Sequence, residues 1–344
     1  MVALGGSIFV FGASWIATFD IWLGRKGHSR VEVLAGLVIL GSIIVAPFSL
    51  LGDLHQPARA WHFYAQIRPE SWMWLGACLL PFFIGFNVLF GYLLVRQRLP
   101  KGGEGLWAKV GSFLRLGSWD GMRALKLVGI LASLSSFSIA FYSGFEIGSV
   151  RAVPLWHTYY LPFLFGTTAF ASGAGFLLFL HRVIHSEADV EEPVTRRLKG
   201  WLQIGVLSIF IAFALWWMSG DMAVQQWQAV IAENAAWFER GLMLLALWAL
   251  SLVLVFWPRA NLTMLAVSGA LITLMSWGYR WVLLMDGQTI PKYGAAVHLY
   301  TPPLDPDGLL GLAASFGLWL ALMVAFSEWV RLGLNDQPEM RHGY

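Results

Sequence analysis

One apolar, helix-length stretch ends in residues that could do acid–base chemistry. The segment from 139 to 151 reads IAFYSGFEIGSVR, and within it Tyr142 and Glu146 are four residues apart. Residues at this spacing share one face of a helix. Because an ionisable side chain is costly to keep inside a membrane span, its presence indicates a substrate, ion or proton site. The chemistry to expect is therefore hydrogen bonding and proton exchange within the bilayer.

Further ionisable residues fall at the same predicted depth, at the outer ends of separate spans. They are Asp53, His55 and Arg59 after the second span, Arg151 after the fourth, and Arg280 and Asp286 at the end of the eighth. Such a cluster suits a quinone headgroup, whose carbonyl oxygens need donors, whose reduced form needs proton acceptors and whose tail needs an apolar cleft. The structural alternative is that Glu146 pairs with an arginine such as Arg151 or Arg280 merely to satisfy burial. For the cluster as a whole we favour the functional interpretation.

Asp20 stands apart from this cluster, near the cytoplasmic end of the first span. It could start a proton path across the membrane, or it could cap its helix near the headgroups beside Arg25 and Lys26. We favour the cap. Small residues at 144, 148 and 172–175 have a spacing that lets membrane helices approach closely, which is a packing signal.

The elements that must position these residues are membrane helices. Of the 344 residues, 58% are hydrophobic and 12% are charged, about half the charged fraction of a soluble domain. Apolar runs of about 20 residues recur, and only helices satisfy the backbone of such runs in lipid. The pattern predicts nine spans, the first retained rather than cleaved as a signal peptide: 2–23, 31–52, 72–95, 127–150, 158–181, 200–219, 239–257, 262–285 and 308–330.

The basic residues predict how these spans are oriented. With nine spans, 17 of the 23 lysines and arginines fall on one side of the membrane. By the positive-inside rule that side is cytoplasmic, so the N-terminus is expected outside and the C-terminus inside. The segment 102–126 is either an amphipathic helix in the interface or an ordinary loop. The predicted parts are 1–181 (helices 1–5), a cytoplasmic hinge loop at 182–199, the remaining core helices at 200–288, and an outer loop, ninth helix and tail at 289–344.

Several cofactors are excluded by residue type. The histidines lie in loops or at span ends, so no haem pair can form within the bilayer; they are His28, His55, His62, His157, His181, His185, His298 and His342. The single Cys78 cannot hold an iron–sulfur cluster, and no metal motif is evident. The formal charge of +3 gives no indication of nucleic-acid binding.

Several ordered motifs resemble one family, the membrane subunits of polysulfide-reductase type, also called the NrfD family. They are GDLHQPARAWHF at 52–63, IRPESWMWLG at 67–76, FYSGFEIG at 141–148, AVPLWHTYYLPFLF at 152–165, SGAG at 172–175 and YRWVLLMDGQ at 279–288. The resemblance implies an all-α integral membrane fold of two four-helix bundles. An extra C-terminal helix, preceded by TPPLDPDGLLG at 301–311, looks like the longer tetrathionate- or sulfur-reductase type.

The resemblance also implies a function: the membrane anchor and quinone-binding subunit of an oxidoreductase complex in anaerobic respiration. Such a subunit carries no haem or iron–sulfur cluster and binds menaquinone or ubiquinone near the outer, periplasmic side of a bacterial or archaeal cytoplasmic membrane. It exchanges electrons between the quinone pool and an iron–sulfur subunit with four cubane clusters. That partner serves a catalytic subunit, also on the outer face, with a molybdenum or tungsten pterin.

Site residues follow from the same resemblance. Tyr142 matches the family's quinone-contacting tyrosine, and Asp53 matches the acid after the second span. The family's histidine in the first span has no counterpart in LGGSIFVFG at 4–12, so Ser7 could take its place, or His55 or Glu146 could supply the missing group. We expect catalytic roles for Tyr142, Glu146, Asp53 and His55, with Arg280 tuning the carboxylates.

The alternative from another class is a proton-coupled secondary transporter. Transporters place their sites near the midplane on broken helices. Here the charges lie toward one face and the spans look unbroken, which favours the quinone-linked interpretation.

Overall fold

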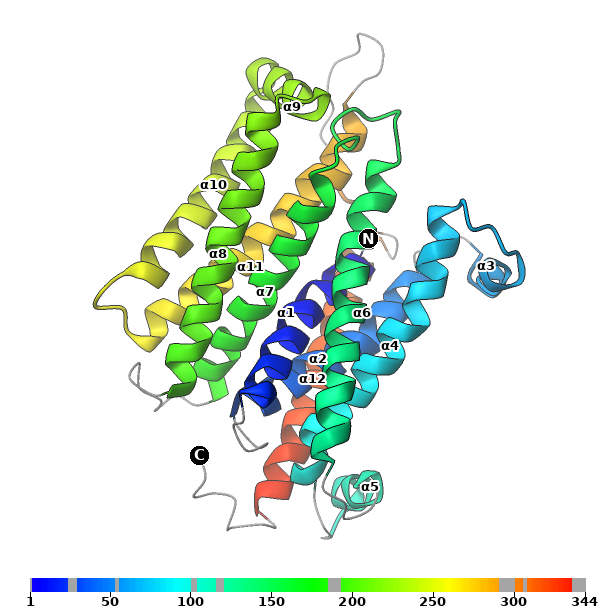
Figure 1. Cartoon of the computed structure of the whole chain (residues 1–344), viewed down its shortest axis with the longest axis vertical. Coiled ribbons are helices and arrows are strands. Elements are labelled where there is room, and N and C mark those ends of the chain that lie inside the picture. Colours follow the sequence, from blue (N-terminus) through cyan, green and yellow to red (C-terminus); the bar gives the residue numbers. More distant parts are fainter. Residues whose placement is uncertain are drawn as a thin grey trace. The chain divides into compact units, whose positions relative to one another are not determined.

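The computed structural model describes residues 2–23, 30–52, 56–99, 104–115, 121–184, 193–290, 301–305 and 308–335. Regular structure in these ranges is entirely helical (Figure 1). The α-helices are α1 (Val2–Trp22), α2 (Arg30–Gly52), α3 (His62–Ala65), α4 (Trp72–Val95), α5 (Leu106–Leu114), α6 (Met122–Gly148), α7 (Leu161–Ile184), α8 (Pro193–Ser219), α9 (Met222–Glu233), α10 (Ala235–Phe256), α11 (Leu262–Trp281) and α12 (Leu309–Asn335).

The helices are those of an integral membrane protein, as predicted. Within the described residues, eight are long and apolar enough to cross a bilayer, and Ile8–Trp22 forms a shorter apolar helix at the first predicted span. These helices are apolar enough to be surrounded by lipid. Pro47 in α2 and Pro81 in α4 interrupt the backbone hydrogen bonds of their helices, which is tolerated because neighbouring groups can bond to the freed carbonyl oxygens. The count of nine spans and their sidedness stay predictions.

The chain divides into two compact units. The first comprises residues 1–65, 78–136 and 304–344, and the second comprises residues 66–77 and 137–303. Two helices, α4 and α6, contribute to both, because the start of α4 (72–77) and the second part of α6 (137–148) belong to the second unit. The predicted division of the chain at 181, 199 and 288 stays a prediction, although within the predicted loop 182–199 the residues from Pro193 onward belong to α8.

A neutral polar cluster ties the first unit together. The Asn87 amide in α4 accepts a hydrogen bond from Ser14 Oγ of α1 at 2.6 Å and donates to Ser136 Oγ of α6 at 2.9 Å. One turn away, Ser133 Oγ donates to Thr18 Oγ1 at 3.0 Å. These bonds join three helices in an otherwise apolar interior, where polar side chains link helices across the bundle.

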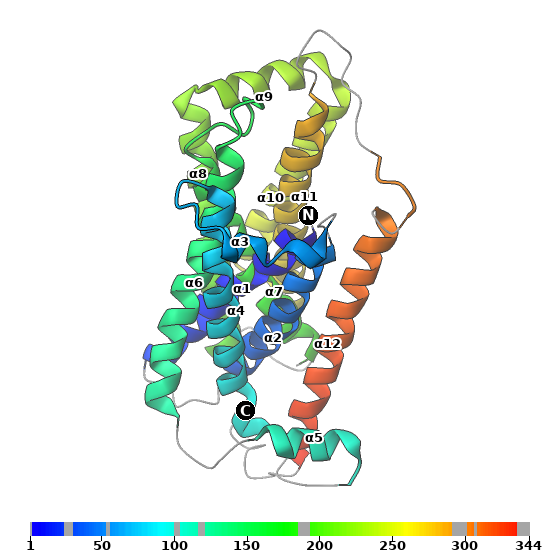
Figure 2. The same ribbon diagram turned by 90° about the vertical axis from the view of Figure 1, so that its right-hand side faces the viewer.

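The last helix, α12, also packs in the first unit. Its Trp319 donates from the indole nitrogen to Ser42 Oγ of α2 at 3.1 Å and stacks on Phe9 of α1, with ring centroids 5.7 Å apart. The short helix α5 lies crosswise near the end of this unit (Figure 2). Tyr92 and Arg115 fix it, by donating to Leu114 O at 2.9 Å and to Leu99 O at 2.9 Å. The helical interpretation of the segment 102–126 is thus confirmed for Leu106–Leu114.

Four long helices, α7, α8, α10 and α11, form the bundle of the second unit. Both α7 and α10 pack on α8 and on α11, and α8 and α11 also touch each other. The helices α7 and α11 approach closely where Gly175 meets Gly269: a Cβ on Gly175 would lie 2.6 Å from the carbonyl oxygen of Gly269. The small-residue signal at 172–175 therefore marks a real helix contact.

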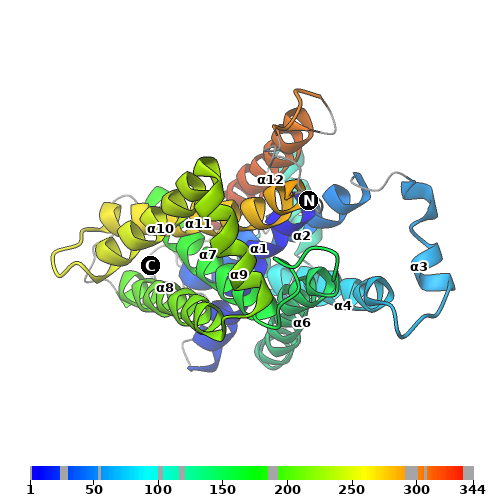
Figure 3. The same cartoon turned by 90° about the horizontal axis from the view of Figure 1, so that it is seen from above.

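One end of this bundle is covered by α9, which lies across it (Figure 3). Asp221 and Asn234 begin α9 and α10 by accepting bonds from backbone N–H groups, as N-cap residues do. Edge-to-face contacts run from Trp216 to Trp227 and from Trp227 to Trp237, with centroids 6.2 and 5.7 Å apart. The connection between the predicted spans 200–219 and 239–257 is thus mostly a packed helix.

Candidate functional site

Tyr142 lies where α6 packs on the first turn of α4, within the second unit. Its hydroxyl donates a hydrogen bond to the carbonyl oxygen of Trp72 at 2.8 Å. The indole of Trp72 in turn stacks on Phe145, with centroids 5.6 Å apart and planes 7° from parallel. Gly76, one turn along α4, makes room for the phenol: a Cβ there would lie 2.2 Å from Tyr142 Oη. The tyrosine ring is therefore held in one position by residues far away in the sequence.

Glu146 lies beside Tyr142, as the four-residue spacing predicted. Both side chains are half-buried on the same face of α6. The Tyr142 hydroxyl donates its proton to the Trp72 carbonyl oxygen, and the Glu146 carboxyl group lies one turn further along the helix. A pair of this kind can present a donor and take up a proton at one place.

The end of α6 is fixed by the loop that follows it. His157 Nδ1 lies 2.8 Å from Gly148 O, and Ser149 Oγ donates to Glu146 O at 2.6 Å. Gly144 touches α7, since a Cβ there would lie 2.4 Å from the Cα of Pro162. The glycines at 144 and 148 thus serve packing, and they hold the tyrosine-bearing turn against its neighbours.

Arg280 lies in the interior of the same unit but makes its contacts with α7. It is 4% exposed, donates to Phe165 O at 2.8 Å, and holds its guanidinium carbon 4.5 Å from the centroid of the Phe165 ring. None of these contacts joins it to Tyr142 or Glu146. Arg151, the other arginine considered as a partner of Glu146, is exposed. These contacts do not place either arginine beside Glu146, whose neighbour on the same helix face is Tyr142.

Three predicted site residues cannot be placed. Asp53 and His55 lie outside the described residues, directly after the end of α2 at Gly52. Ser7 belongs to α1, but its side chain also lies outside the described residues. Their roles stay predictions.

Asp20 is a buried residue of the first unit. It lies near the end of α1 and is 4% exposed. Close by on the same helix, Thr18 bonds to Ser133 of α6, and Trp22 carries the Lys126 ammonium 5.3 Å from its ring centroid. The burial of Asp20 agrees better with a place inside the bundle than with a cap among headgroups, and its part in a proton path stays a prediction.

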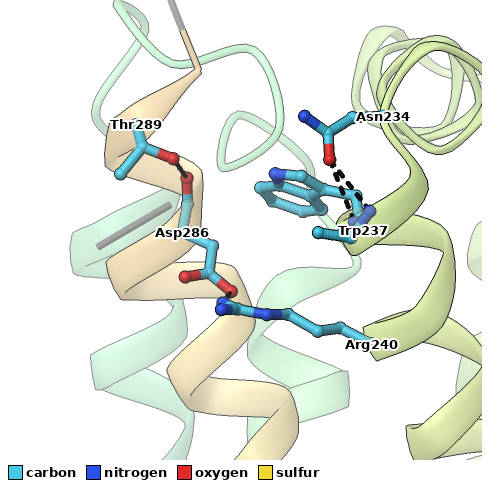
Figure 4. Close-up of polar contacts among 6 residues, drawn as sticks. Asn234, Trp237, Arg240, Asp286 and Thr289 are labelled. Carbon is cyan, nitrogen blue, oxygen red and sulfur yellow. Dashed lines mark hydrogen bonds and ion pairs between the residues drawn. The ribbon is translucent and has the colours of Figure 1, made fainter. Parts of the chain in front are cut away.

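The second unit also contains an ion pair that the sequence did not predict. Arg240 of α10 forms an ion pair with Asp286 (Figure 4). Asp286 ends a π-helical turn, Val282–Asp286, that continues α11, and π-helical turns are frequent at functional sites. The sequence placed Asp286 in the predicted outer cluster but gave no signal for its contact with Arg240, because that contact depends on the packing of α10 on α11.

Within the described residues, no group of three or more histidine, cysteine, aspartate or glutamate side chains could hold a metal ion. Among the described residues, the second unit instead contains the neighbouring side chains of Tyr142 and Glu146, a buried arginine that donates to a carbonyl oxygen, and the ion pair of Arg240 with Asp286. The fold and these groups define a multi-pass helical membrane protein with acid–base groups inside its helical bundle.

Comparison with known proteins agrees with this class. The family described as polysulphide reductase, NrfD, matches residues 8–292, and the chain belongs to that family. It is 31% identical to a tetrathionate reductase subunit of Salmonella typhimurium, over 97% of this chain and 92% of that protein. It is 21% identical to a selenate reductase subunit of Mesobacillus selenatarsenatis, over 96% of this chain and 85% of that protein. The predicted family is thus confirmed, and the match to the family ends before α12.

Proposed function

We propose that this chain is the membrane subunit of a respiratory reductase complex and that it binds quinone or quinol at Tyr142 and Glu146. The observation that carries the proposal is the placement of this pair: a phenol and a carboxylate on one half-buried helix face, with the exposed rings of Trp72 and Phe145 beside them. Polar groups at an apolar, aromatic surface suit a headgroup with two oxygens and an isoprenoid tail. Family membership supports the same assignment.

The residues present fit such a ligand. A bound quinol would supply two electrons and two protons on oxidation. The Tyr142 hydroxyl can rotate from the Trp72 carbonyl oxygen toward a ligand oxygen. The hydrogen bond that it gives up joins α6 to α4 and is not one of the backbone hydrogen bonds within either helix. Glu146 can accept a proton at its carboxylate, four residues along the same face. Asp53, His55, Arg280 and Ser7 remain proposed contributors from neighbouring segments.

The proposed partners follow from the relatives. By name, both relatives are subunits of larger reductases, one of tetrathionate reductase and one of selenate reductase. We infer for this chain an iron–sulfur partner subunit and a molybdopterin or tungstopterin catalytic subunit on the outer face of a bacterial or archaeal cytoplasmic membrane. Menaquinone or ubiquinone is the inferred electron carrier, and the substrate chemistry belongs to the catalytic partner.

The substitution Tyr142→Phe tests the site. It removes the hydroxyl and keeps the ring that packs on Gly76, so the complex should assemble while quinol oxidation falls by about tenfold or more. The measurement is quinol-dependent reduction of the terminal acceptor by purified complex. Tyr92→Phe is the matched control, because Tyr92 also donates to a backbone carbonyl, Leu114 O at 2.9 Å, but lies in the first unit. Equal activity in the two variants would reject Tyr142 as the quinone contact.

A second substitution reaches the same site through its packing. Gly76→Ala places a methyl group where the Tyr142 hydroxyl lies and should displace the phenol. Quinol oxidation should fall as it does in Tyr142→Phe. Gly85→Ala on the same helix is the control, since a Cβ at Gly85 meets nothing within 4 Å. If both alanine variants kept wild-type turnover, the position of the phenol would have no part in the reaction.

A further inference from the structure

The short helix α5 of the first unit carries large apolar side chains on an exposed face. Leu106 and Phe113 are 72% and 76% exposed. Lys109 is also exposed and lies on the same face, because it is three residues from Leu106 and four from Phe113. Ala108 and Gly111, on the opposite face, are buried, and α12 packs against the helix. The first unit thus holds α5 by one face and leaves leucine, lysine and phenylalanine on the other.

The neighbouring helices place α5 at the level where membrane spans end. It lies between α4 and α6, which are both long and apolar enough to cross a bilayer, and it runs across the direction of α4 (Figure 2). Tyr92, in the last turn of α4, donates to Leu114 O at the end of α5 at 2.9 Å. A helix at this level with apolar residues on its exposed face is typical of helices that lie in the membrane interface.

A second contact marks the same level of the first unit. Lys126, near the start of α6, holds its ammonium nitrogen 5.3 Å from the ring centroid of Trp22, which is an exposed residue at the end of α1. Tryptophan gathers at membrane–water interfaces, and lysine there extends its ammonium group toward the headgroups. Because α6 is the next helix after α5, this contact supports an interfacial position for α5.

The surface at this end is basic. In the described stretches 104–115 and 121–126, the cations that reach the surface outnumber the acids: the cations are Lys109, Arg115, Arg123 and Lys126, and the acid is Glu104. Arg115 directly follows α5 and donates one N–H group to Leu99 O at 2.9 Å. Burial and the positive charge of Arg96 lower the pKa of Arg115. An anionic group beside Arg115 would offset that repulsion between two guanidinium groups.

We propose that α5 lies in the membrane interface and binds the phosphate headgroup of an anionic phospholipid. Leu106 and Phe113 enter the outer part of the acyl-chain region, while Lys109 and Arg115 bind the phosphate. A guanidinium group has several N–H donors in a fork that fits phosphate oxygens, so the bond to Leu99 O leaves others for the lipid. The site belongs to the first unit and does not depend on the proposed quinone chemistry.

Native mass spectrometry of the purified, delipidated complex tests the headgroup. The complex is titrated with phosphatidylglycerol or with phosphatidylcholine of the same acyl chains, and the wild type should bind phosphatidylglycerol more tightly. Lys109→Gln and Arg115→Gln should each weaken phosphatidylglycerol binding by about fivefold, the contribution of one basic residue near an anionic surface. Arg68→Gln is the matched control, because Arg68 is an exposed arginine before the opposite end of α4; it should bind like the wild type.

Photocrosslinking in native membranes tests what covers the exposed face. A photoreactive phenylalanine analogue is placed at position 113, where the exposure of the side chain leaves room for it. The proposal predicts an adduct with phospholipid. The same analogue at position 210 is the positive control for lipid, because Phe210 is an exposed residue in the membrane-length helix α8.

The proposal is overturned by any of three results. An adduct of position 113 with another polypeptide, or with nothing, would mean that lipid does not cover this face. Equal binding of the two lipids by the wild type would remove the anionic headgroup, and an equal loss in Arg68→Gln would remove the site from α5. If Arg115→Gln fails to assemble because the bond to Leu99 O is lost, the exposed Lys109 decides through Lys109→Gln. Quinol turnover is not measured, so failure here leaves the proposed function untouched.

Discussion

Two buried polar clusters differ in how well they are satisfied. Around Asn87 in the first unit, the amide and the serine hydroxyls find partners on α1, α4 and α6, and no charge is involved. Around Asp286 in the second unit, a full charge is buried, one carboxylate oxygen and one indole N–H have no partner among the described residues, and the partner arginine reaches the surface. The first cluster links helices through neutral hydrogen bonds, whereas the second is an ion pair between α10 and the π-helical turn after α11.

The difference shows which polar groups in a membrane bundle indicate function. A satisfied neutral network links helices at a gain of well under 2 kcal/mol per bond. A buried ion pair repays its desolvation poorly and is weak evidence for stability. Stability alone therefore does not explain the ion pair of Arg240 with Asp286.

The largest effect on stability is expected from removing one partner of the ion pair between Arg240 and Asp286. Arg240→Met leaves Asp286 buried without a counter-charge and should lower the free energy of unfolding by about 3–5 kcal/mol. The measurement is unfolding in SDS followed by tryptophan fluorescence. The double variant with Asp286→Leu should regain most of that loss, because no charge then remains. A loss below about 1 kcal/mol in the single variant would contradict the ion pair.

A smaller loss is expected from the neutral cluster. Asn87→Ala removes the bonds to Ser14 and Ser136 together with the one to Phe83 O. At about 0.6 kcal/mol for each interhelical bond and somewhat more for the groups left unpaired, the free energy of unfolding should fall by about 2 kcal/mol. Activity of the assembled protein should stay at the wild-type level. A loss of turnover without a loss of stability would show that this cluster is more than a connector.

The smallest effect is expected at the edge of the neutral cluster. Ser133→Ala loses one bond between helices, to Thr18, and should cost about 0.6 kcal/mol in the same unfolding assay. Ser143→Ala is the control on the same helix, because its hydroxyl bonds to Ala140 O of α6 itself. The control should cost less than Ser133→Ala. The reverse order would mean that interhelical bonds do not stabilise this unit.

Helix positions could be predicted from the sequence wherever polar residues flank an apolar run on both sides. The span expected at 72–95 coincides with α4, Trp72–Val95. The span expected from residue 200 begins instead at Pro193, because a helix continues through Thr195, Arg196 and Arg197 beyond the point where its apolar part ends. Hydrophobicity marks the apolar segment, and it does not mark the last turn.

The site could be predicted only within one helix. The spacing of Tyr142 and Glu146 gave their shared face, but the Trp72 carbonyl that accepts from Tyr142 is 70 residues away in the sequence. The contact of Arg240 with Asp286 likewise requires α10 to pack on α11, and the π-helical turn that presents Asp286 has no sequence marker. Contacts between helices depend on packing, which one sequence without relatives does not disclose.

Purification from the native membrane tests the central claim most directly. The protein is extracted gently, every co-purifying polypeptide is identified, and the same sample is assayed for iron, molybdenum, tungsten and extractable quinone. The proposed function predicts two larger partner subunits, iron together with a pterin metal, and bound quinone that Tyr142→Phe diminishes. A lone, stable polypeptide without metal or quinone would contradict it and would favour the proton-coupled transporter instead.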